Sequence, residues 1–377
     1  MAEQTKNEAI CLVNTPERLI ELTEAIRQAP RIAVDTEFHA ERRYQPQLML
    51  VQIATGPGAV WLLDPLAVDP TPALSVISNQ ELIVHSGTHD LRLIAALGAR
   101  PTRIFDTQQA AGLLGLRYPE RLSTLIAHFL DVPMDKGSTL SDWSARPLTS
   151  RQIRYAAADA LLLLPLAERL MTHLSQRDRL GWAWELGEEL RTNALEADRR
   201  PNLIDSWEIC SRLDDDALKV LDALQTWRFE QAERRDKPPY YLLPDSMLLD
   251  LARRRPTSIR ALSENRRLNT GLVKRHGRDI LGCIQNAQRA PLARFPPTLP
   301  ERQKGRVLSM WAELVGEPRD ISPKLLLPEP LNVVREGTAA LTGWRSTFHD
   351  SLKNLLTGQE VITFSNNGEK VHLKKRD

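Results

Sequence analysis

The 377 residues are 42% hydrophobic and 26% charged, which excludes a disordered or fibrous chain and favours two or three ordinary domains. No apolar run approaches the roughly 20 residues that span a bilayer, and the polar start MAEQTKNEAI lacks the features of a signal peptide, so we expect a cytoplasmic protein. The net charge of +2 hides an acidic part, residues 1–200, and a basic remainder, a division that favours separate catalytic and polyanion-binding regions.

The first 200 residues alternate short apolar segments with helical patterns. One helical pattern opens after a capping residue at Asn14 or Thr15 and runs to residue 28. Five segments have the composition of strands, and they cover residues 31–38, 48–54, 59–64, 82–85 and 104–106. Gly56-Pro57-Gly58 predicts a hairpin turn between the second and the third. The early hairpin and the later crossover helices predict an α/β domain, with a mixed five-stranded sheet and helices on both faces.

Beyond about residue 205 the pattern is helical. Four helical segments cover residues 215–236, 245–254, 256–263 and 270–286, and a similar order recurs faintly between residues 300 and 356. This recurrence indicates a duplicated small helical module. We therefore expect three domains, comprising residues 1–205, 206–290 and 291–377. The polar, basic tail from residue 358 is expected to be frayed or loosely attached.

Asp35 and Glu37 stand at the end of the first predicted strand. Because they are two residues apart, their side chains share one face of the strand. Two divalent cations need carboxylates that converge in this way from a rigid element. A loop that begins with a capping Asp explains an isolated Asp-X-Glu just as well, so the pair alone does not define a site.

Two further acids, Asp90 and Asp159, change this balance. Asp90 opens a predicted helix and could be no more than an N-cap. Asp159 lies within the apolar helical segment RQIRYAAADALLLLPLAERL, where an ionised carboxylate is costly to bury without a partner. Tyr155 precedes it by one helical turn on the same face. A metal ion would be a suitable partner for Asp159, and the phenol could orient an attacking water.

Three motifs together resemble the ribonuclease D family of the DEDD exonuclease superfamily. They are VDTEF (34–38) with the following YQPQLMLVQIA (44–54), VHSGTHDL (84–91), and YAAADALLLL (155–164), preceded by SDWSARPLT (141–149). The resemblance covers residues 9 to about 200. Residues 212–290 resemble an HRDC helical module, of which this family can carry two. The resemblance implies a ribonuclease H-like catalytic domain followed by two small all-α HRDC-like domains.

The same resemblance implies the roles of the site residues. Asp35, Glu37, Asp90 and Asp159 would hold two Mg²⁺ or Mn²⁺ ions, and Tyr155 would position the attacking water. The superfamily divides on whether His or Tyr precedes the last Asp, and because the position of that His is occupied here by an arginine, the tyrosine branch is the match. Zinc would call for His or Cys ligands, and neither type clusters in the sequence.

The implied activity is that of a 3′→5′ exoribonuclease. It would release nucleoside 5′-monophosphates during 3′ maturation of transfer RNA precursors and other structured RNAs, acting as a monomer. Phe38, Trp143 and Arg146 could contact the substrate, although core packing explains them equally well. A DNA 3′→5′ exonuclease is an alternative, because the acids contact phosphate and metal rather than sugar. A non-catalytic nucleic-acid-binding protein is a second, which retention of all four acids and the tyrosine disfavours.

Overall fold

The computed structural model describes residues 9–39, 43–133, 141–195, 203–205, 213–265, 267–287, 298–365 and 370–376. The chain forms two compact units. The first comprises Met1–Phe38, Leu48–Ala197 and Lys304–Asp377, and the second comprises His39–Gln47 and Asp198–Gln303. The three domain boundaries expected from the sequence stay a prediction. The structure adds that the C-terminal segment from Lys304 belongs to the same compact unit as the sheet.

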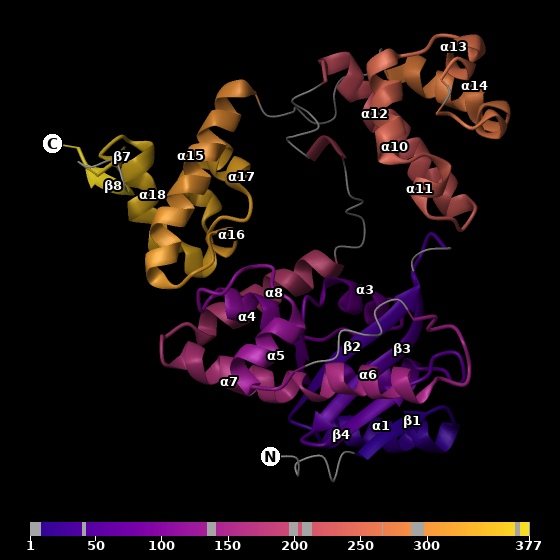
Figure 1. Ribbon diagram of the computed structural model, residues 1–377, viewed down its shortest axis with the longest axis vertical. Helices are drawn as coiled ribbons and strands as arrows, with labels where there is room; N and C mark the ends of the chain where they lie inside the picture. Colours follow the sequence, from indigo (N-terminus) through magenta and orange to yellow (C-terminus); the bar gives the residue numbers. More distant parts are fainter. Residues whose placement is uncertain are drawn as a thin grey trace. The chain divides into compact units, whose positions relative to one another are not determined.

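The first unit is built on a mixed sheet of six strands in the order β1-β4-β3-β2-β5-β6 (Figure 1). Its strands are β1 (Ala9–Val13), β2 (Arg31–His39), β3 (Gln47–Gly56), β4 (Ala59–Leu63), β5 (Glu81–Val84) and β6 (Arg103–Asp106). β3 and β4 are antiparallel, as the predicted hairpin requires, while β1 runs parallel to β4, and β5 runs parallel to both β2 and β6. The α/β class is confirmed.

The strand count of five was wrong, because β1 was missed. Ala9 pairs with Ala59, so the partner of this edge strand lies far along the chain. Pairing at such a separation leaves no local signal, and a five-residue apolar segment before a helix is ambiguous by periodicity alone.

Helices cover both faces of the sheet. On one face Leu22, Leu74 and Ile94, from α1, α2 and α3, pack with Val34 of β2. The other face carries Ala33 and is covered by α4 to α7. The helices are α1 (Pro16–Gln28), α2 (Thr71–Ile77), α3 (Thr88–Ala96), α4 (Thr107–Gly112), α5 (Leu122–Leu130), α6 (Ser150–Leu161) and α7 (Leu163–Ser175). Alternate residues of one strand therefore serve two separate cores.

A long helix, α8 (Leu180–Leu195), lies against the edge strand β6. Gly187 makes this close approach possible, since a β-carbon there would come within 1.8 Å of the carbonyl oxygen of Ile104. The edge of the sheet at β6 is thus covered by a helix, which blocks strand addition at that edge.

The C-terminal segment packs into the core beside the sheet. Its elements are α15 (Leu299–Gly316), α16 (Pro323–Leu326), α17 (Pro330–Glu336) and α18 (His349–Leu356), with short 3₁₀ turns between them. Trp311, Leu325 and Trp344 are buried in the same apolar cluster as residues of α4, α6 and α7. The ring of Trp344 stacks on Trp182 of α8, with centroids 4.9 Å apart. The Arg345 guanidinium also bonds the Glu189 carboxylate at 2.5 Å.

The tail is more ordered than the sequence suggested. β7 (Glu360–Phe364) and β8 (Val371–Lys375) form an antiparallel pair, and Ile362 and Leu373 pack against the large apolar cluster. Alternation of apolar and polar residues in these two short segments is the signal that the basic composition obscured.

The second unit has its own apolar core. It contains α10 (Asp215–Arg234), α11 (Pro239–Leu242), α12 (Asp245–Arg254), α13 (Ile259–Ser263) and α14 (Thr270–Ala287). Leu221 and Leu224 of α10 pack with Leu248 of α12 and Ile280 of α14. Within the described residues, no helix of either unit is long and apolar enough to cross a membrane.

Candidate active site

Three carboxylates converge where β2 meets α6. Oxygen atoms of Asp35, Glu37 and Asp159 all lie within 4.8 Å of one another. Asp35 and Glu37 follow Ala33 at two-residue intervals along β2, so they point to the face of the sheet that α6 covers. The two acids of β2 therefore share one face and lie close to Asp159, while their role as metal ligands stays a prediction.

The local sequence of α6 places Asp159 close to the sheet. Thr149 and Gln152 form a capping box that fixes the start of the helix. Ala156 and Ala160 are fully buried, and their small side chains let the helix approach the strands closely. Asp159, only 8% exposed, is thereby held against β2 rather than in solvent. The run of alanines in the motif therefore has a packing reason.

Tyr155 lies one turn before Asp159 on the same helix, and its side chain is hydrogen-bonded to the Asp159 carboxylate. Its ring packs against Trp143, with centroids 6.2 Å apart. The phenol is thus held at the acidic cluster, one helical turn from Asp159.

Asp90 lies in the first turn of α3 and is 8% exposed. Its carboxylate accepts a hydrogen bond of 2.5 Å from the Thr36 hydroxyl, a residue between the two acids of β2. It is not among the three acids whose oxygens lie within 4.8 Å of one another. Its charge nevertheless reaches them, because it raises the pKa of both Asp35 and Glu37. Asp90 therefore lies beside the cluster, and the hydrogen bond from Thr36 orients the Asp90 carboxylate.

The four acids lie close together and are largely buried, so a positive charge is needed to stabilise their ionised forms. Burial, followed by the charges of the other three acids, raises the pKa of Asp35 well above its ordinary value. Burial and the neighbouring aspartates raise the pKa of Glu37 to about 8. Burial raises the pKa of Asp90 to about 6. Burial also raises the pKa of Asp159 to about 6, although the hydrogen bond from Tyr155 lowers it. Carboxylates so arranged cannot all ionise near neutral pH without a cation. An all-oxygen donor set of this charge fits hard divalent metals.

Two positioning residues escaped the sequence analysis. The Thr36 hydroxyl orients Asp90, and Asp106 at the end of β6 secures the loop before Asp90. The Asp106 carboxylate accepts hydrogen bonds from the backbone N–H of Gly87 at 3.0 Å and of Gln108 at 2.8 Å. The position of Asp106 at the end of a strand was a signal in the sequence. Its bond to Gly87 was not, because that bond joins two segments that come together only in the folded chain.

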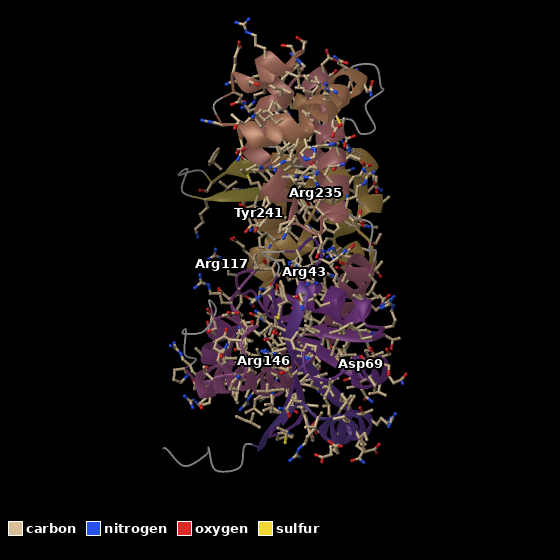
Figure 2. All side chains as sticks on the ribbon, turned by 90° about the vertical axis from the view of Figure 1, so that its right-hand side faces the viewer. Arg43, Asp69, Arg117, Arg146, Arg235 and Tyr241 are labelled. Carbon is tan, nitrogen blue, oxygen red and sulfur yellow. The ribbon has the colours of Figure 1, made fainter. Side chains whose placement is uncertain are left out.

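The three residues proposed as substrate contacts occupy different environments. Trp143 is 3% exposed and packs on Tyr155. Arg146, labelled in Figure 2, is bound through two nitrogens to the Asp64 carboxylate at 2.5 and 2.8 Å, and it also bonds the Met49 carbonyl. Phe38 is half-buried beside the ring of His89. Trp143 and Arg146 thus have structural partners, and contact with substrate stays a prediction for all three.

Comparison with known proteins gives the class of the molecule. A family model described as 3′-5′ exonuclease matches residues 10–175, which include β2, α3 and α6 with all four acids. A second model, the HRDC domain, matches residues 217–284 in the helical unit. The fold and the acidic site therefore define a 3′→5′ exonuclease followed by an HRDC module.

Proteins that are similar along most of their length identify the family within this class. Ribonuclease D of Gluconacetobacter diazotrophicus is 31% identical, with 93% of this chain and 94% of the relative covered. Ribonuclease D of Escherichia coli is 30% identical over 76% of each chain. The crystal structure of the Escherichia coli protein, described as an exoribonuclease involved in structured RNA processing, matches with a TM-score of 0.78 at 27% identity, covering 93% of this chain and 99% of that one. The chain belongs to the ribonuclease D family, and it is an exoribonuclease of that type.

Proposed function

We propose that this exoribonuclease releases nucleoside 5′-monophosphates from RNA 3′ ends with two Mg²⁺ or Mn²⁺ ions held by Asp35, Glu37, Asp90 and Asp159. The observation that carries the proposal is the convergence of three of these carboxylates within 4.8 Å, with the fourth in electrostatic contact. When bound, such ions polarise the scissile phosphate and make a coordinated water acidic enough to attack near neutral pH.

The protein residues would supply orientation. A phenol has an ordinary pKa of about 10, which makes it a weak base at neutral pH. Tyr155 is therefore cast as a positioner of the attacking water first and a proton acceptor second. Its bond to Asp159 and its packing on Trp143 support this role, because both restrict the ring before substrate arrives.

The substrates we propose are 3′ ends of structured RNAs such as transfer RNA precursors. The relatives named ribonuclease D support an RNA substrate. The HRDC unit offers a second support: the rings of Tyr240 and Tyr241 stack 4.8 Å apart and are 51% and 62% exposed. Arg235 lies at the end of α10, just before this pair (Figure 2). Exposed aromatic rings beside cations suit unpaired nucleotides. The monomeric state and the cytoplasmic location stay predictions.

The test is incubation of a 3′-tailed transfer RNA precursor with Mg²⁺ or Mn²⁺, with and without chelator, followed by measurement of product lengths. We expect stepwise shortening with release of mononucleotides, lost on chelation. Internal cleavage would contradict the proposal. Matched RNA and DNA oligonucleotides in the same assay test the DNA alternative, for which DNA would be degraded at least as fast.

A further inference from the structure

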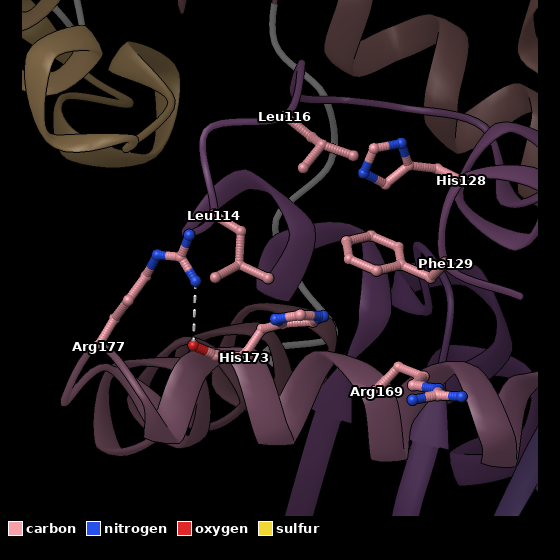
Figure 3. A pocket seen from close by; sticks show the side chains of 7 residues that line it. All are labelled: Leu114, Leu116, His128, Phe129, Arg169, His173 and Arg177. Atoms are coloured by element: carbon pink, nitrogen blue, oxygen red, sulfur yellow. Dashed lines mark hydrogen bonds between the residues drawn. The ribbon is translucent and has the colours of Figure 1, made fainter.

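A cavity lies in the sheet-containing unit, and it shares no lining residue with the acidic site. It has a volume of about 280 Å³ and lies between the end of α5 and α7 (Figure 3). The lining residues are Leu114, Leu116, His128, Phe129, Arg169, His173 and Arg177. None of these seven is an acid, so within the described residues the cavity combines cations, imidazoles and apolar groups.

The ring system of the cavity is centred on Phe129. Its ring lies 4.7 Å from that of His128 at nearly a right angle, and 5.7 Å from that of His173. Leu114 and Leu116 close the apolar side of the cavity (Figure 3). The half-buried rings of Phe129 and His173, beside an apolar wall, suit a flat aromatic ligand such as a nucleobase.

The two arginines carry charge that the surrounding protein does not neutralise. Among the described residues Arg169 makes no ion pair, and the one bond of Arg177 is a long contact of 3.4 Å to the His173 carbonyl oxygen. The charge of Arg177 also helps burial to lower the pKa of nearby Arg179. Many other arginines of the chain are paired, for example Arg146 with Asp64. The guanidinium groups in the cavity therefore remain available to an anion.

We propose that this cavity binds one nucleotide of a single-stranded RNA, with the base against Phe129 and His173 and the phosphate at Arg169 and Arg177. The proposal rests on the proposed function, because it places an upstream part of the same substrate here. α7 begins at Leu163, with one residue between it and the end of α6, so the ten residues from Asp159 to Arg169 separate their Cα atoms by at most about 20 Å, counting 1.5 Å per helical residue and 3.8 Å for each step through the break. The cavity is thus near enough to hold the strand whose 3′ end occupies the acidic site.

The experiment compares two RNA probes on the full chain. A fluorescent 12-nucleotide single-stranded RNA reports on both sites, whereas a dinucleotide reaches the acidic site alone. Binding of the 12-mer is measured by anisotropy in chelator, which prevents hydrolysis, and mononucleotide release from both probes is measured with Mg²⁺ or Mn²⁺. The charge-reversal variant is Arg169→Glu with Arg177→Glu. The matched control is Arg18→Glu with Arg27→Glu, two exposed positions on α1, which packs on the opposite face of the sheet.

We expect charge reversal in the cavity to weaken 12-mer binding at least about tenfold. The slope of log affinity against log salt concentration should fall by the equivalent of about one to two phosphate contacts. Phe129→Leu keeps an apolar side chain but removes the ring, so it should weaken binding at least about fivefold without changing the salt dependence. Both variants should hydrolyse the dinucleotide at the unmodified rate. Equal 12-mer affinity for the cavity variant and the α1 control would overturn the proposal.

Two further arms separate the alternatives. AMP titrated into the chelated protein tests a free nucleotide as the occupant, and AMP binding that is lost on charge reversal while 12-mer binding is kept would overturn the RNA assignment. Absence of mononucleotide release from either probe by the unmodified chain would instead refute the proposed function. The 12-mer binding data would then still decide whether the cavity binds single-stranded RNA.

Discussion

The buried carboxylates of the acidic site cost the metal-free protein stability. The pKa of Glu37 is raised to about 8 and that of Asp159 to about 6, so the folded protein holds protons that the unfolded chain releases. The free energy of unfolding should therefore fall as pH rises from the ordinary carboxyl range near 4 to about 8. A divalent cation should cancel this decline by favouring the ionised forms.

Thermal unfolding between pH 5 and 8, in chelator and in Mn²⁺, measures this effect. Asp159→Asn should flatten the decline in chelator, whereas Asp69→Asn, at an exposed carboxyl with a lowered pKa, should not. A melting temperature that rises with pH in chelator would contradict the assignment of repulsion to this cluster.

Substitution of Asp159 should lower the turnover rate although it raises stability in chelator. We expect Asp159→Asn to fold, to melt higher in chelator and to lose turnover by a factor of at least about 1,000, since the substitution removes one of the proposed metal ligands. Tyr155→Phe should cost about 10- to 100-fold, because it removes the phenol hydroxyl but keeps the ring against Trp143. Initial rates on a labelled RNA, with circular dichroism as a control for folding, test both. Full activity of the Asp159→Asn protein would remove the metal-ligand assignment.

The sequence singled out those candidate site residues that break a local rule. Asp159 stands out as a carboxylate in an apolar helix, and Tyr155 lies on the same face by spacing alone. Thr36 and Asp106 break no rule, because a hydroxyl in a strand and an Asp at a strand end are ordinary. Their roles depend on bonds to Asp90 and Gly87 across the fold. Such partners cannot be inferred without the tertiary structure.

At the level of elements, the packing distance of α6 decides the geometry of the site. Ala156 is fully buried against the core, whereas Ala158 on the same helix is half-exposed. Ala156→Leu should push α6 away from the sheet, costing about 1–3 kcal/mol of stability and lowering turnover with it.

Ala158→Leu is the matched control, with the same added volume toward solvent. Urea unfolding and initial rates compare the two proteins. Equal effects of the two substitutions would show that α6 does not set the position of Asp159.

Elements with local signals were predicted, and those with remote partners were not. The hairpin between β3 and β4 was found from Gly56-Pro57-Gly58, and the α6 pattern from its apolar period. β1 was missed because its pairing partner Ala59 belongs to a distant segment. The tail was expected to be frayed or loosely attached because its basic composition outweighed a short alternation, yet β7 and β8 pair there. Periodicity reports which face of an element is buried, but not against what.

At the scale of the whole molecule, the C-terminal helices and the sheet share one core. The sequence showed apolar helical faces in this segment, yet nothing in that pattern indicates whether they cover each other or a neighbour. The structure places Trp311 and Trp344 in the cluster that underlies α4, α6 and α7. Arg179 bonds the carbonyl oxygens of Leu113 and Asp320, at 2.8 and 2.9 Å, and so joins the two segments. The C-terminal segment therefore supports the catalytic half directly.

This shared core predicts cooperative unfolding. Trp344 is 2% exposed and stacked on Trp182, so Trp344→Ala should lower the free energy of unfolding of the sheet-containing unit by about 3–5 kcal/mol. The nuclease activity and the C-terminal helices should be lost in one transition, because these helices have no core apart from the one that they share with α4, α6 and α7. Trp227→Ala is the matched control, since Trp227 is 7% exposed within the core of the helical unit. It should destabilise that unit while leaving dinucleotide hydrolysis intact. Urea titration followed by residual activity and by hydrogen exchange distinguishes the two, and exchange of the C-terminal helices well before activity is lost would show that they are an appendage rather than part of the catalytic core.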